Sequence, residues 1–207
     1  MIDARWRHTR DLVAAHRALD AEERDHQRAI LALIDSAAAS AGPDVFSRQH
    51  FAPGHLTASA FVIDASRTSL LLVWHLKLER WLQPGGHIEP EDPDVLLAAA
   101  REVAEETGLS GCTPLGPGLF DVDVHAIPAR GGARAEPAHA HHDLRVALVA
   151  PAGAEAIVGD GVGAVRWVPL DAFDRLAHDG SLPTDRSVMR AVERLQRRLG
   201  PITTEKA

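Results

Sequence analysis

Apolar residues change their spacing at about residue 56, from a helical pattern to a strand-like one. Residues 1 to about 40 carry helix-forming side chains without proline, and Asp20 followed by Glu23 is typical of a capped helix start. We therefore expect two short helices, the second ending at Ala41-Gly42-Pro43. Phe46 to Gly54 is expected to be a connection.

Short apolar and β-branched runs then predict strands. Thr57–Ile63 and Ser69–His75 are separated by a turn-like segment, which suits an antiparallel pair. A further short strand is expected to end at Trp81-Leu82-Gln83. Regular structure is expected to break at Pro84-Gly85-Gly86.

A helix over residues 93 to 107 follows, with Asp92 as its N-cap, Pro93 in its first turn and Gly108 at its end. Three more strands are expected, and an amphipathic helix closes the pattern. These elements cover residues 119–127, 143–150, 165–168 and 186–199.

This order of elements predicts the α+β class, in the form of a mixed sheet with helices packed on it. The amino-terminal helices form an extension over residues 1–50, and the main domain covers residues 51–200. The extension is a dimer surface, a lid or a covering layer, and the sequence leaves these three alternatives open.

The helix over 93 to 107 carries a stripe of carboxylates. Glu102, Glu105 and Glu106 lie within about 100° of one another around a helix axis, so three like charges share one face. Such a set of oxygen donors suits a hard cation, Mg²⁺ or Mn²⁺. Arg101 is the basic residue next to these glutamates, and it is placed to orient one carboxylate by a charge-assisted hydrogen bond.

The segment from Arg101 to Leu109 resembles the second half of the signature of the Nudix hydrolase family. That signature reads Arg-Glu-aliphatic-any-Glu-Glu-any-Gly-aliphatic, and every specified position matches. The first half departs from the family, because the loop after Gly85 or Gly86 is longer by one or two residues. The fourth acid of the signature is therefore left open among Glu89, Glu91 and Asp92.

This resemblance implies a Nudix fold, an α/β/α sandwich with the mixed sheet between helices. It also implies a metal-dependent hydrolase that cuts the phosphoanhydride bond of a nucleoside-diphosphate-linked substrate. It implies that Glu102, Glu105 and Glu106 bind the divalent cations. One acid near them activates the attacking water, and we favour Glu105, with Arg101 in support. Gly85 and Gly86 bring the backbone close to the phosphates. His87, which follows them, is placed to bind substrate, although a structural role is equally expected.

Two other polar groups invite functional interpretations. His139, His141 and His142 are expected in a loop, either as a solvated segment near the substrate, which we favour, or as a zinc site. Asp121, Asp123 and His125 alternate with two valines on a strand. We expect the valines to face inward and the acids to face solvent, in preference to a second acidic site.

Trp74, Trp81 and Trp167 lie in apolar strands. Core positions are favoured for them over stacking on a nucleobase.

Composition narrows the classes that remain. A formal net charge of −7 argues against a nucleic-acid binder that depends on phosphate contacts. If the substrate is a phosphorylated small molecule, a cation must offset the charge of the protein. The single cysteine, Cys112, excludes an internal disulfide. No long apolar run or leader pattern is present, so we expect a cytoplasmic protein without membrane contact.

Two rival functions are a catalytically silent nucleotide-binding or regulatory module on the same fold, and an isomerase on that fold, for which Cys112 is poorly placed. A homodimer is left open.

Overall fold

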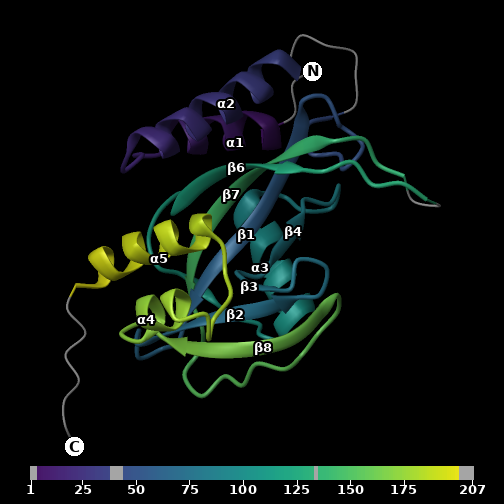
Figure 1. Cartoon of the computed structure of the whole chain (residues 1–207). Coiled ribbons are helices and arrows are strands. Elements are labelled where there is room, and N and C mark those ends of the chain that lie inside the picture. The colour runs from purple at the N-terminus through teal and green to yellow at the C-terminus, as the bar shows by residue number, and fades with distance from the viewer. Residues whose placement is uncertain (1–3, 38–43, 133–134, 201–207) are drawn as a thin grey trace, which may run out of the picture. The chain divides into compact units, whose positions relative to one another are not determined.

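The structure is a computed structural model that describes residues 4–37, 44–132 and 135–200 (Figure 1). These residues form two compact units. The first takes in the described residues up to Ser59, together with Gly85–Arg101 and Gly116–Val146. The second takes in Ala60–Pro84, Glu102–Leu115 and the described residues from Ala147 onward. Strands β1 (Gly54–Ile63) and β7 (His139–Val149) and helix α3 (Val95–Thr107) contribute residues to both units.

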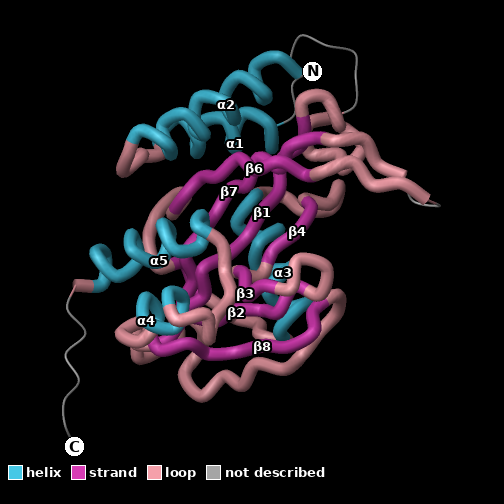
Figure 2. Tube along the Cα trace, viewed as in Figure 1, coloured by secondary structure: helices cyan, strands magenta, loops and turns pink. Residues whose placement is uncertain are grey.

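The first unit begins with helices α1 (Ala4–Ala15) and α2 (Ala21–Ala37), which pack on each other (Figure 2). The predicted cap is confirmed, because the Asp20 carboxylate accepts from the Glu23 amide at 2.8 Å. Helix α2 also packs against strand β6 (Asp121–Ile127). Helix α2 therefore covers this strand.

The strands of the first unit are held in fixed register. Strand β6 pairs antiparallel with β7, so that Asp123 lies opposite Asp143 and His125 opposite His141. Strand β4 (Gly85–His87) pairs antiparallel with β1, which places His87 opposite Thr57. Residues of one face of this sheet recur at every second position.

The second unit is built around strand β2 (Ser69–His75). It pairs antiparallel with β1, with β3 (Arg80–Leu82) and with β8 (Val162–Pro169). Helices α4 (Phe173–His178) and α5 (Arg186–Leu199) follow β8, and α5 buries an apolar stripe that includes Val188 and Leu195. The two-residue strand β5 (Thr113–Pro114) pairs with the end of β7.

The strand order β3-β2-β1-β7-β5 confirms a mixed sheet. Most pairings are antiparallel, but β1 and β7 run in the same direction. The amide of Ala140 donates to the carbonyl of Pro53, and ten residues further along both strands Ala150 donates to Ile63. Equal steps in the same sense are the parallel arrangement. The α+β class is therefore confirmed.

Several local predictions are wrong. Helix α3 begins at Val95 and is capped by Asp94, whose side chain accepts from the Leu97 amide at 2.8 Å, so Asp92 is not the cap. The predicted break holds at Pro84, which lies between β3 and β4, but is wrong for Gly85 and Gly86, which are in β4. Strand β7 starts at His139, so residues 139–142 of the predicted loop are strand.

Two elements, β5 and α4, were not predicted, since both are too short to show a period. The predicted helix stop at Ala41-Gly42-Pro43 lies outside the described residues. Among the described residues, none of the helices has the length and apolar content needed to cross a membrane.

Candidate active site

The three glutamates of the carboxylate stripe lie on the last two turns of α3, in the second unit. Glu102 and Glu106 are half-buried, and Glu105 is exposed. Spacing of three and four residues along a helix keeps their side chains on one face. The predicted stripe is therefore on a regular helix, with water access at its middle member.

The carboxyl end of α3 is tied down by backbone contacts. The amides of Ile157, Gly159 and Asp160 donate to the carbonyls of Thr107, Glu106 and Glu105 at 2.9 Å each. These are carbonyls that a helix end otherwise leaves without partners. The loop before β8 therefore fixes the turn of α3 that carries Glu105 and Glu106.

Arg101 belongs to the first unit, where its guanidinium binds the Asp92 carboxylate. Its Nε and Nη2 atoms donate to the two oxygens of the Asp92 carboxylate at 3.1 and 2.9 Å, and Nη2 also donates to the His87 carbonyl at 2.9 Å. The Glu89 amide donates to the same carboxylate at 2.8 Å. Arg101 thus holds the loop between β4 and α3 against the middle of that helix.

Asp92 is buried, with 6% of its surface exposed. Burial alone would raise the pKa of Asp92, but the Arg101 guanidinium and the Glu89 amide hold it below its usual value. Of the three candidates for the fourth acid, Asp92 is thus occupied by Arg101, whereas Glu89 and Glu91 are exposed.

The glycine pair has a packing role in this structure. A Cβ on Gly85 would lie 2.3 Å from the Cβ of Ser59, because β4 runs directly beside β1 there. Gly86 lies opposite Ala58 in the same ladder, and His87, half-buried, ends the strand. The substrate-binding role predicted for these three residues stays a prediction.

The prediction that Asp121 and Asp123 face solvent is wrong. They are 1% and 3% exposed, and with Asp143 they surround the buried guanidinium of Arg145. Arg145 contacts the three carboxylates at 3.1, 3.2 and 2.9 Å. Burial opposes its charge, but the three acids raise the pKa of Arg145 well above its ordinary value.

Hydroxyl groups complete this cluster, which we call the arginine network (Asp121, Asp123, Asp143 and Arg145). Thr57 and Ser59 of β1 donate to the Asp143 carboxylate at 3.0 and 2.7 Å. His26 of α2 lies 3.5 Å from Asp123. Four elements therefore meet at one set of buried charges in the first unit.

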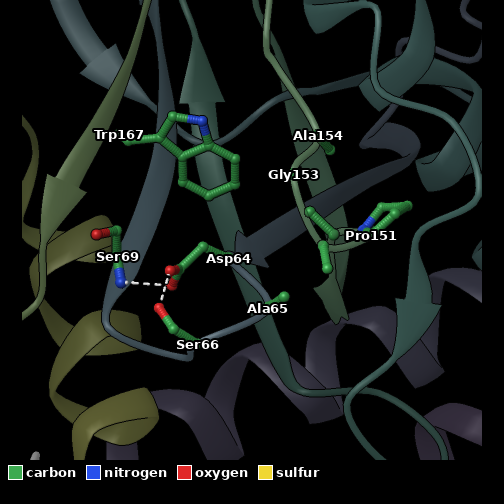
Figure 3. Close-up of a pocket in the computed structure, with 10 residues that line it drawn as sticks. Asp64, Ala65, Ser66, Ser69, Pro151, Gly153, Ala154 and Trp167 are labelled. Atoms are coloured by element: carbon green, nitrogen blue, oxygen red, sulfur yellow. Dashed lines mark hydrogen bonds between the residues drawn. The ribbon is translucent and has the colours of Figure 1, made fainter.

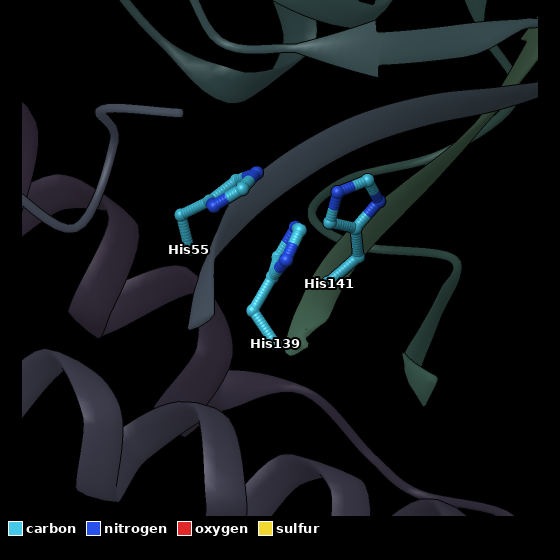
Figure 4. Close-up of side chains that lie close together, drawn as sticks. All are labelled: His55, His139 and His141. Carbon is cyan, nitrogen blue, oxygen red and sulfur yellow. The ribbon is translucent and has the colours of Figure 1, made fainter. Parts of the chain in front are cut away.

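The histidines predicted in a loop lie instead on β7. His139 and His141 are two residues apart and share the face of the arginine network, while His142 points to the other face. His55 of β1, which the sequence did not single out, joins them: its ring centroid lies 5.1 Å from that of His139 and 4.8 Å from that of His141 (Figure 4).

The rings of His55 and His141 are held in the neutral form. Burial, reinforced by neighbouring histidines, lowers the pKa of His55 to about 4 and that of His141 to about 2. Burial also lowers the pKa of His87. His125 differs: burial lowers its pKa, but the hydrogen bond to Asp123 at 3.0 Å and the charges of Asp143 and Asp123 together outweigh burial and raise it.

A signal for this face was present in the sequence. His139, His141, Asp143 and Arg145 alternate with other residues, as do His55, Thr57 and Ser59. Period-two polarity of this kind marks one face of a strand. It did not show that the polar face would be buried.

The second unit contains a cavity of about 390 Å³ lined in part by Trp167 (Figure 3). At its polar end, Asp64 accepts from the amides of Thr68 and Ser69 at 2.7 Å each and from the Ser66 hydroxyl. These contacts serve the turn between β1 and β2, so the carboxylate is already engaged. None of the predicted catalytic or metal-binding residues lines the cavity.

The core positions predicted for the tryptophans are wrong, because Trp74, Trp81 and Trp167 are all half-buried. Trp74 and Trp81 pack edge to face, with ring centroids 5.5 Å apart.

The chain is similar to known proteins in sequence and in fold. Residues 53–192 match the NUDIX domain family. A NUDIX hydrolase from Nitrosomonas europaea is 18% identical, and the match covers 73% of this chain and 98% of that one with a TM-score of 0.51, which shows a shared fold. No curated protein matched the chain.

Two further solved structures match over similar lengths. A NUDIX-family hydrolase from Clostridium perfringens is 23% identical, covering 70% of this chain and 97% of that one, with a TM-score of 0.49. The NUDIX domain of Shewanella oneidensis NrtR, complexed with ADP ribose, is 21% identical, covering 80% and 98%, with a TM-score of 0.47.

Proposed function

Because the chain belongs to the NUDIX domain family and is a pyrophosphohydrolase of that family, we propose that it hydrolyses a nucleoside-diphosphate-linked substrate with Mg²⁺ or Mn²⁺. Glu102, Glu105 and Glu106 bind the cations in this proposal. The observation that carries it is their placement on one face of a regular helix whose end is anchored by the loop before β8. The proposed domain runs over residues 51–200, with residues 1–50 as an extension.

The donor set fits a hard cation. Three carboxylates offer only oxygen ligands, which Mg²⁺ and Mn²⁺ prefer to nitrogen or sulfur. Glu105 is exposed, so the set is open to water and to phosphate oxygens on that side. A bound cation would draw charge from the phosphates and lower the pKa of a coordinated water.

Groups of the protein itself carry out proton transfer and positioning. Glu105 takes the proton of the attacking water. Arg101 is a positioning residue, because its contacts with Asp92 and the His87 carbonyl hold the loop after β4. Gly85, Gly86 and His87 bind the substrate in this proposal. The leaving group and the base of the nucleotide are not specified by these contacts.

A substrate panel tests this function. Nucleotide sugars, dinucleoside polyphosphates, nucleoside triphosphates and coenzyme A derivatives are incubated with the purified chain with and without Mg²⁺ or Mn²⁺, and products are identified by mass spectrometry. We expect metal-dependent release of a phosphorylated product from at least one class. Binding without turnover across the panel would favour the catalytically silent module instead.

The role of Glu105 is tested by Glu105→Gln, which keeps the size of the side chain but removes the base and one metal ligand. We expect kcat to fall by at least about 100-fold. Glu193→Gln, on the exposed part of α5, is the matched control and should leave kcat unchanged. Turnover of Glu105→Gln within about threefold of the wild type would remove Glu105 as the base.

A further inference from the structure

Three strands of the first unit bring their histidines together. His55 comes from β1, His87 from β4, and His139 and His141 from β7. Figure 4 shows the rings of His55, His139 and His141 gathered beside the strands from which they project. One ligand atom from each of these three lies within 4.8 Å of the other two. We call these three residues the histidine cluster.

The spacing suits one shared ion. Nitrogens about 2.0–2.1 Å from a tetrahedral zinc ion lie roughly 3.4 Å from one another. The three nitrogens are already within 4.8 Å, so small rotations of the side chains would bring them to that distance. All three residues are on paired strands, which limits how far their backbones can separate.

The hydrogen bonds of two rings leave the right atoms free for an ion. Nδ1 of His139 lies 2.8 Å from the Pro137 carbonyl, and Nδ1 of His55 lies 3.3 Å from the His50 carbonyl. A carbonyl only accepts, so each Nδ1 carries the proton and donates, and each Nε2 has a lone pair. Histidines that bind metal ions usually have this second contact.

The free lone pair of His55 needs a partner. His55 is 1% exposed, and its Nε2 is buried without a hydrogen-bond partner in the part of the chain that the structure describes. A buried polar atom without a partner is costly, and such atoms call for an explanation. A metal ion beside this nitrogen would satisfy it.

The surroundings of the cluster are partly closed. Phe51 packs its ring edge on His139, with centroids 5.2 Å apart. His55 and His139 are buried, but His141 is half-buried and leaves one side open. Three imidazoles with one open side are the donor set of catalytic zinc sites.

We propose that His55, His139 and His141 bind one transition-metal ion of the zinc class, with a fourth coordination position left for water or an anionic oxygen. The ion differs in kind from the one proposed for the α3 glutamates. Imidazole nitrogens suit Zn²⁺, Co²⁺, Ni²⁺ or Cu²⁺, whereas three carboxylates suit Mg²⁺ or Mn²⁺. His87, with its ring centroid 5.1 Å from that of His55, flanks the ion without binding it.

Zinc and cobalt binding to the full-length chain test the proposal. The chain is stripped with a chelator and titrated with Zn²⁺ by calorimetry and with Co²⁺ by visible absorption, which reports tetrahedral nitrogen ligation. Four proteins are compared: the wild type, H141N, the control H125N, and the helix variant E102Q/E105Q/E106Q. His125 suits the control because its ring lies 5.5 Å from that of His141 but bonds to Asp123.

We expect one tight Zn²⁺ site and a tetrahedral Co²⁺ spectrum in the wild type, in H125N and in the helix variant. His141→Asn should lower the Zn²⁺ affinity by at least about tenfold and remove the spectrum. Zn²⁺ should also raise the Tm of the wild type but not that of H141N. Melting of each metal-free variant shows whether it folds, and H139N replaces H141N if the latter does not.

Unchanged Zn²⁺ affinity in a folded H141N, or loss of the tight site in the helix variant alone, would overturn the proposal. So would a wild type without a tight site or without the tetrahedral spectrum. Failure of the hydrolase proposal looks different, because it would appear as missing Mg²⁺- or Mn²⁺-dependent turnover while Zn²⁺ binding is unchanged.

Discussion

The role of Asp92 is determined by its contact with Arg101. It was one of three candidates for the fourth acid of the signature, and its buried carboxylate is held by Arg101 and by the Glu89 amide. Asp92→Asn keeps the size but removes the charge. We expect it to lower the free energy of unfolding by about 2 kcal/mol at neutral pH, since Arg101 loses its charged acceptor. Urea denaturation measures this change.

The same variant makes a pH prediction. The pKa of Asp92 lies below its unfolded value of 3.8, so the folded chain binds fewer protons there. Its contribution is fully present above about pH 4 and is lost as pH falls through the folded pKa. The difference between wild type and D92N should therefore be constant from neutral pH to about pH 4 and shrink below it. A difference that grows in acid would contradict this, and the exposed Asp171→Asn is the control.

Cys112 separates the hydrolase from the isomerase alternative. It is half-buried, and burial raises the pKa of its thiol above the ordinary value, which disfavours the reactive thiolate. Alkylation by iodoacetamide should be slower than for free cysteine. Turnover of Cys112→Ser should stay within about twofold of the wild type. Fast alkylation of Cys112, together with loss of turnover in Cys112→Ser, would instead favour the isomerase alternative.

Whether the sequence revealed a site residue depended on how far along the chain its partners lie. Glu102, Glu105 and Glu106 were found because one helical turn brings them together. His55 and Arg145 were missed as site residues because His139, Asp121 and Asp123 come from other strands, 84 residues away in the case of His55 and His139. Strand pairing and register decide such contacts, and neither is encoded in a local period.

Helix α3 depends on a loop far along the chain. The segment 157–160 satisfies the last carbonyls of the helix, and Gly159 lies so close that an added Cβ would be 2.0 Å from the Glu105 carbonyl oxygen. Backbone atoms cannot move away from an added Cβ as readily as the end of a flexible side chain can. Even a methyl group at residue 159 must therefore displace either the loop or the end of the helix.

Gly159→Ala should lower the free energy of unfolding by about 1–3 kcal/mol. It should also weaken Mg²⁺ or Mn²⁺ activation, because the displaced turn carries Glu105 and Glu106. Thermal melting and the metal dependence of kcat measure the two effects. Gly131→Ala is the matched control, since an added Cβ there meets open space. Equal behaviour of the two variants would show that the loop does not position α3.

Elements with strong local signals were predicted well. Helix α5 has the predicted bounds because it combines an N-cap, Asp185, with a clear apolar stripe. Strand β4 was wrongly assigned as a break because its first two residues are glycines, which local preference excludes from strands. The close approach of β1 overrides that preference, and only tertiary structure reveals it.

At the scale of the whole molecule, the arginine network joins elements that are distant in sequence. Strands β6 and β7 supply the acids and Arg145, β1 supplies two hydroxyl donors, and α2 approaches through His26. The sequence predicted a solvated acidic face here. The mistake has a physical cause: buried acids are rare unless paired, and the pairing guanidinium was not recognised.

Arg145→Met tests how much the fold depends on this network. The substitution keeps an apolar stem of similar length but leaves three buried carboxylates without their cation, so the free energy of unfolding should fall by about 3–5 kcal/mol. Urea denaturation gives the value. Arg130→Met, at a half-exposed pair with Glu136, should cost no more than about 1 kcal/mol. If the two variants cost the same, protons or water must replace the guanidinium among the acids, and the network would not hold β1, β6 and β7 together.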